Sequence, residues 1–160
     1  MGGDGDSSAS TATQAAPTTA PSTTAAPTTT APTEPVDAWA SRADAICTRY
    51  QKQIDAIQPP ATPTDAAPTL RRTLVPIRQQ EAALKKLGPP EQNPTMGLAF
   101  IGSIVSTRKA LEQVVAGLEA NDAATTQEGY AKAGAAGART RQYATQLGLV
   151  HCGAPRSGAG

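Results

Sequence analysis

The chain has 160 residues, a formal net charge of +1 at pH 7, one histidine and two cysteines. This near-neutral balance lacks the clustered basic surface of nucleic-acid-binding domains, so we expect no nucleic-acid partner. The longest apolar run, residues 96–105, is much shorter than the roughly 20 apolar residues that a membrane-spanning helix requires.

The first segment, residues 1–35, consists mainly of Thr, Ala, Pro and Ser and contains no Lys or Arg. Such a composition cannot bury enough apolar surface to offset the entropy of ordering, so we predict a disordered stalk. The small polar residues after Met1 are similar to those that follow the lipid-modified cysteine of bacterial lipoproteins. We therefore expect either such a cysteine before Gly2, a cleaved secretory signal or an uncleaved membrane anchor in the native protein.

Two helices are predicted in the first half of the domain that we assign to residues 36–153. The first covers Asp37 to Ile57, with Asp37 as its N-cap and Pro59 and Pro60 ending it. The second covers Asp65 to Leu87, with Thr64 or Asp65 as its N-cap, a kink expected at Pro76 and Gly88 as its C-cap. Apolar residues recur at spacings of three and four along both helices, as expected for one buried face.

Two further helices are predicted in the second half. The third begins at the cap Asn93 and runs to about Ala120, and the fourth runs from about Ala123 to Leu147. The fourth is rich in Gly and Ala, which indicates either close packing against a neighbouring helix or a groove left open for a ligand. Gly148 is predicted to end this helix, with the apolar residues after it folding back as the partner of the cap.

The short connections between these helices favour an all-α, up-down-up-down four-helix bundle. In that arrangement the first and fourth helices are adjacent, and the C-terminal segment can run back along the first. We expect a monomer, and we expect residues 154–160 to form a flexible C-terminal tail.

The two cysteines, Cys47 on the first helix and Cys152 after the fourth, are predicted to form a disulfide. The alternatives are a metal site and a reactive thiol. A zinc site needs four ligands, and two distant cysteines with a single histidine do not supply them, so no metal is expected.

Two short motifs lie near the two ends of this domain, Ala-Asp-Ala-Ile-Cys at residues 43–47 and Gly-Leu-Val-His-Cys-Gly at residues 148–153. Together with the stalk and a Pro-Pro turn, they resemble a group of uncharacterised actinobacterial exported proteins of lipoprotein type. That resemblance implies a disulfide-clamped helical domain and brings no known activity.

No arrangement of residues typical of catalysis or cofactor binding is recognisable, so we expect neither an enzyme nor a cofactor. His151 lies in a tail and is interpreted as a surface residue. Most acidic side chains are expected on solvated faces or in caps, namely Asp44, Asp55, Glu81, Glu112, Glu119 and Glu128. Basic residues of the second helix form a stripe that either meets an anionic polymer or lipid or is simply solvated: Arg71, Arg72, Arg78, Lys85 and Lys86.

These features predict a non-enzymatic binding or interaction module of the bacterial cell envelope, tethered outside the cytoplasm or secreted. Its partner would be an envelope protein or a polymer, and its contact with the membrane would come only through a lipid anchor. The alternative is a carrier of a small apolar ligand, a lipid or haem, in a groove along the fourth helix. The candidate groove residues are Trp39, Tyr50, Phe100, Tyr130, Gly134, Gly137, Tyr143 and His151.

Overall fold

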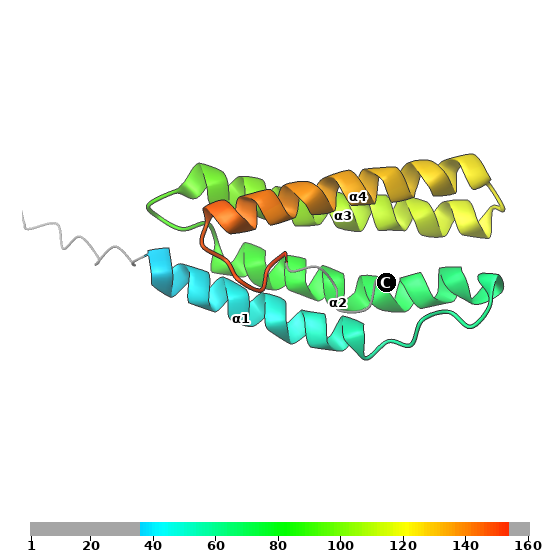
Figure 1. Cartoon of the computed structure of the whole chain (residues 1–160), viewed down its shortest axis with the longest axis horizontal. Helices are drawn as coiled ribbons and strands as arrows, with labels where there is room; N and C mark the ends of the chain where they lie inside the picture. Colours follow the sequence, from blue (N-terminus) through cyan, green and yellow to red (C-terminus); the bar gives the residue numbers. More distant parts are fainter. Residues whose placement is uncertain (1–35, 154–160) are drawn as a thin grey trace, which may run out of the picture. The chain divides into compact units, whose positions relative to one another are not determined.

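The computed structural model describes residues 36–153, and within this range it is all-helical, with no strand (Figure 1). The predicted stalk, residues 1–35, and the predicted tail, residues 154–160, lie outside the described residues. A short 3₁₀ turn, η1 at Pro63–Asp65, precedes the second helix. The four α-helices are α1 at Val36–Asp55, α2 at Ala66–Leu87, α3 at Pro94–Glu119 and α4 at Ala123–Gln146.

The predicted caps are confirmed where they depend on short-range chemistry. Asn93 accepts a hydrogen bond from the backbone N–H of Met96 at the start of α3, and Asp122 accepts one from Thr125 at the start of α4. Gly88 and Gly148 both have a positive φ, at 75° and 70°, directly after α2 and near the end of α4. These local signals therefore set the ends of three helices.

Other details of the helix ends differ from prediction. α1 begins at Val36, so Asp37 lies in its first turn and is not its N-cap. The backbone N–H of Thr62 donates to Asp65 at the 3₁₀ turn, and Asp65 makes no side-chain cap on α2. α2 continues through Pro76 to Leu87 as predicted, and the kink expected at Pro76 stays a prediction.

The core lies at one end of the domain, where the first turns of α1 and α3, the last turns of α2 and α4, and the C-terminal segment pack together. Phe100 and Leu84 are fully buried, and the indole N–H of Trp39 donates to the carbonyl of Gly88 at 2.9 Å, which links α1 to the end of α2. The main apolar cluster consists of Trp39, Ala40, Ala43, Cys47, Leu84, Phe100, Ile101, Ile104, Ala144, Leu147, Leu149 and Cys152.

Backbone contacts join α1 to α2, α2 to α3 and α3 to α4, but none joins α1 to α4 in the described range. The expected direct packing of the fourth helix on the first is therefore not found. Residues 147–153 connect the two instead: they leave the end of α4 and reach α1 at Cys47 (Figure 1). Leu149 is buried as predicted, whereas Val150, which was also expected to fold back, is 72% exposed.

Candidate functional site

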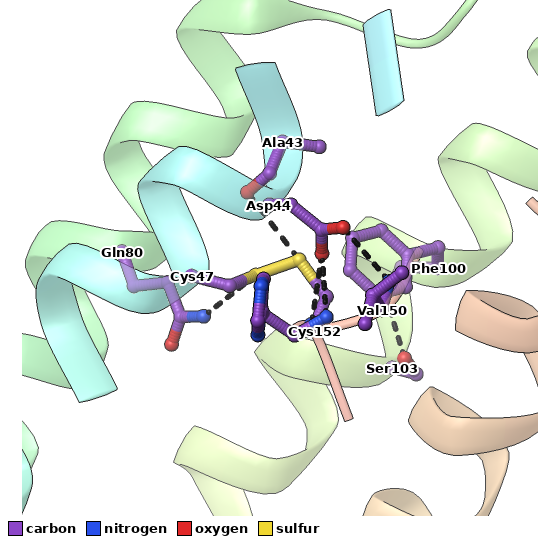
Figure 2. Close-up of a disulfide and its surroundings, with 9 residues drawn as sticks. Ala43, Asp44, Cys47, Gln80, Phe100, Ser103, Val150 and Cys152 are labelled. Atoms are coloured by element: carbon purple, nitrogen blue, oxygen red, sulfur yellow. Dashed lines mark hydrogen bonds between the residues drawn. A yellow bond between two sulfur atoms is a disulfide. The ribbon is translucent and has the colours of Figure 1, made fainter. Parts of the chain in front are cut away.

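The disulfide fastens the C-terminal segment to α1. Cys47 and Cys152 are bonded with their Cα atoms 5.1 Å apart, a usual separation for a disulfide, and both residues are buried. The side-chain amide of Gln80, on α2, donates to the Sγ atom of Cys47 at 3.2 Å. The predicted disulfide is thus formed, and it lies where α1, α2 and the C-terminal segment meet (Figure 2).

Asp44 forms a second attachment, one helical turn before Cys47. Its carboxylate accepts hydrogen bonds from three consecutive backbone N–H groups, those of Val150, His151 and Cys152, at 2.8, 2.9 and 3.1 Å (Figure 2). The prediction that Asp44 is only a solvated helix-surface residue is therefore wrong. The spacing of Asp44 and Cys47 was the available signal. Residues three apart on a helix share one face, so a segment bonded to Cys47 passes close to Asp44.

A groove of about 480 Å³ is lined by residues of all four helices and of the C-terminal segment. α1 and α4 make no backbone contact, and residues 147–153 cross between them. The disulfide and Gly153 form part of the groove wall at that crossing. The aliphatic and aromatic side chains of the lining are Ile54, Leu70, Ile77, Phe100, Ile104, Leu111 and Ala133.

The polar groups of the lining are mostly engaged within the protein. The hydroxyls of Thr73, Thr107 and Thr140 each donate to the carbonyl four residues earlier in their own helix. Gln51 donates to Asp55, and Gln80 donates to the disulfide as described above. The groove therefore offers a mainly apolar surface with few polar groups left for a ligand.

The lining contains three of the eight predicted groove residues, Phe100, Gly137 and His151. The other five lie elsewhere. Trp39 is buried in the core, Tyr130 is half-exposed and Gly134 faces open space, with no atom within 4 Å of where a Cβ would be. Neither Tyr50 nor Tyr143 lines the groove, and Tyr143 packs against the core cluster.

The glycines of α4 divide between the two predicted roles. A Cβ at Gly129 would lie 2.7 Å from a methyl carbon and 2.9 Å from the backbone nitrogen of Val114, so this glycine permits close approach of α3. Gly137, by contrast, lines the groove, and a Cβ there would meet only the guanidinium of Arg141, at 3.8 Å. The same helix thus packs tightly at one end and leaves open space further along.

A cluster of charges links α2 and α3. Glu81 is only 8% exposed and accepts hydrogen bonds from Lys85 and Arg108, at 2.5 and 2.6 Å, and Arg108 also pairs with Glu112. Burial alone would raise the pKa of Glu81, but these hydrogen bonds and positive charges outweigh it and lower the pKa below the ordinary value of 4.5. The prediction that Glu81 lies on a solvated face is therefore wrong.

Part of the predicted basic stripe of α2 pairs with acidic residues. Arg71 pairs with Glu119, Arg78 pairs with Glu112 at 2.8 Å, and Lys85 pairs with Glu81. These pairs tie α2 to α3 or to itself. Three of the five residues of the stripe are thus intramolecular ion-pair partners, while Arg72 donates to Thr69 and Lys86 is exposed.

Within residues 36–153, no group of three or more His, Cys, Asp or Glu side chains is arranged to hold a metal ion. None of the helices in this range combines the length and hydropathy needed to cross a membrane. No protein-family model, curated protein or solved structure matches the chain.

Proposed function

We propose that this protein is a non-enzymatic binding module of the bacterial cell envelope and that the groove between α1 and α4 is its binding site. The observation that carries the proposal is the groove, which has a mainly apolar lining to which every helix contributes. Concave, apolar sites with few polar groups are typical of small-molecule binding. Of the two partner classes considered, this favours a small apolar ligand over an envelope protein or polymer.

The architecture that we propose for the module is an up-down-up-down four-helix bundle that is open along one side. The contacts between consecutive helices support it, as does the short connection between α3 and α4 at Ala120–Asp122. Figure 1 shows α1 beside α2 and α3 beside α4. In this arrangement the C-terminal segment replaces the missing contact between α1 and α4 at one end and leaves the remainder accessible.

We also propose that the domain works outside the cytoplasm, either held at the surface by its stalk and a lipid anchor or secreted. The disulfide supports this location because such bonds persist mainly in oxidising compartments. The Thr, Ala and Pro composition of residues 1–35 supports the presence of a spacer.

A neutral fluorescent probe, N-phenyl-1-naphthylamine, tests the proposed site. We expect saturable binding of one probe per chain. Gly137→Leu should weaken this binding at least tenfold, because the new side chain starts from the groove lining and meets no backbone atom.

The matched control is Gly134→Leu, on the same helix but outside the lining, where a side chain also finds open space. Both changes replace a helical glycine by a better helix former, so neither should destabilise the fold. Binding that is absent from the wild-type protein, or is equal in all three proteins, would overturn the proposal.

A further inference from the structure

We propose that the ligand of the groove is a single-chain amphiphile with an anionic head group, a fatty carboxylate, whose head group pairs with Arg141. This inference rests on the proposed function and specifies the class of ligand. Three features of the groove carry it: its length, the engagement of its hydroxyls, and the sign of its charge.

The first feature is the length of the apolar wall. Phe100 belongs to the core cluster around the disulfide, whereas Leu111 lies three turns further along α3. With the rise of an α-helix, the wall between these two residues is about 16 Å long. A fully extended polypeptide advances about 1.2 Å per backbone bond. An extended alkyl chain has similar bond lengths and angles, so a chain of ~12 carbons fits along this wall.

The second feature is the chemistry of the wall. An alkyl chain makes no hydrogen bonds, so a site that holds one must leave no polar group unsatisfied when water is displaced. The three threonines of the lining meet this requirement because their hydroxyls already donate to helix carbonyls. In the part of the chain that the structure describes, no buried side-chain nitrogen or oxygen lacks a hydrogen-bond partner.

The third feature is the charge at the disulfide end. No Asp or Glu lines the groove, and its one permanently charged residue is Arg141. A Cβ at Gly153 would lie 3.1 Å from the Cα of Arg141, so this arginine lies where the C-terminal segment crosses the groove. Its guanidinium turns back along α4, with Nη1 3.8 Å from the Cβ position of Gly137.

Arg141 differs from the arginines of the cluster between α2 and α3. Arg71, Arg78 and Arg108 all pair with glutamates. The exposed guanidinium of Arg141, by contrast, makes no ion pair or hydrogen bond with any residue in the range 36–153, and only the backbone carbonyl of Arg141 accepts a hydrogen bond, from the hydroxyl of Thr145. An unpaired guanidinium over an apolar groove is complementary to a carboxylate at the end of an alkyl chain. A cationic amphiphile would be repelled, and a neutral one would gain nothing from this charge.

Competition for the bound N-phenyl-1-naphthylamine tests the inference, with dodecanoate and dodecan-1-ol compared below their aggregation concentrations. The two competitors share one chain length and differ in head-group charge. We expect dodecanoate to bind about fivefold more tightly, the effect of a partly exposed ion pair. Arg141→Gln should abolish this preference, whereas Arg139→Gln, an exposed position of α4 outside the lining, should preserve it.

The outcomes separate the two proposals. Equal binding of the acid and the alcohol to the wild-type protein, or a preference that survives Arg141→Gln, overturns the head-group assignment while the groove stays the binding site. A probe that binds but is displaced by neither amphiphile overturns the acyl-chain assignment. If the probe itself does not bind, the proposed function fails and this inference fails with it.

Discussion

Removal of the disulfide should lower the thermal stability strongly and leave the helices intact at low temperature. The bonded cysteines are 105 residues apart, so the chain-entropy relation gives a stabilisation of about 4.8 kcal/mol at 25 °C as an upper value. A domain of about 118 residues has an unfolding entropy of about 0.25 kcal/mol/K, which converts this free energy into a melting-temperature decrease of about 19 °C.

The assay is thermal unfolding of the double variant Cys47→Ser/Cys152→Ser, followed by circular dichroism at 222 nm. The double change avoids a single unpaired thiol, and wild-type protein treated with a reductant serves as the second sample. Helicity at 5 °C should be retained, because the crosslink acts mainly on the unfolded chain and the apolar core remains. A decrease of less than about 3 °C, or loss of helix in the cold, would refute this reasoning.

Three further changes test the contacts around the core. Asp44→Ala should cost about 1–2 kcal/mol and accelerate amide exchange of residues 150–152, whereas Asp55→Ala should leave that exchange unchanged. Glu81→Gln should cost about 2 kcal/mol at pH 7. Because the folded-state pKa of Glu81 is depressed, the wild-type advantage in urea denaturation should be complete above pH 4.5 and shrink as the pH falls through that lower pKa. Gly129→Ala should destabilise by about 1–3 kcal/mol because its Cβ meets backbone of α3, while Gly134→Ala should stabilise by up to ~1 kcal/mol. Equal effects of these two alanines on the urea midpoint would contradict the packing described for α4.

The sequence was most informative where structure depends on neighbouring residues. Asn93 and Asp122 begin helices because their side chains reach amides three residues ahead, and Gly88 and Gly148 provide positive φ without steric cost. All four helices were consequently predicted to within a few residues. The disulfide was also predicted correctly, although the packing of the fourth helix on the first, from which it was argued, is not found, because the C-terminal segment itself crosses to α1.

The sequence was least informative about contacts between elements that are distant along the chain. The same pattern of spacing describes a solvated glutamate and Glu81, whose burial depends on Arg108 from another helix. The predicted groove combined aromatic residues such as Trp39 and Tyr130, of which the first is buried in the core and the second is half-exposed. Thr107 and Arg141 line the groove but have no aromatic ring, so the sequence did not single them out as groove residues. Their position depends on the separation of α1 from α4, which the sequence did not predict.

The most direct test of the central claim is a ¹⁵N NMR titration of the whole chain with dodecanoate. The amides of Ile104, Gly137 and Gly153, which line the groove, should shift with one common dissociation constant. The amides of Gly102 and Gly134, which face open space on the same two long helices, should stay in place. Shifts confined to the exposed glycines, or no saturable shift at the groove residues, would contradict the claim that this groove binds a ligand.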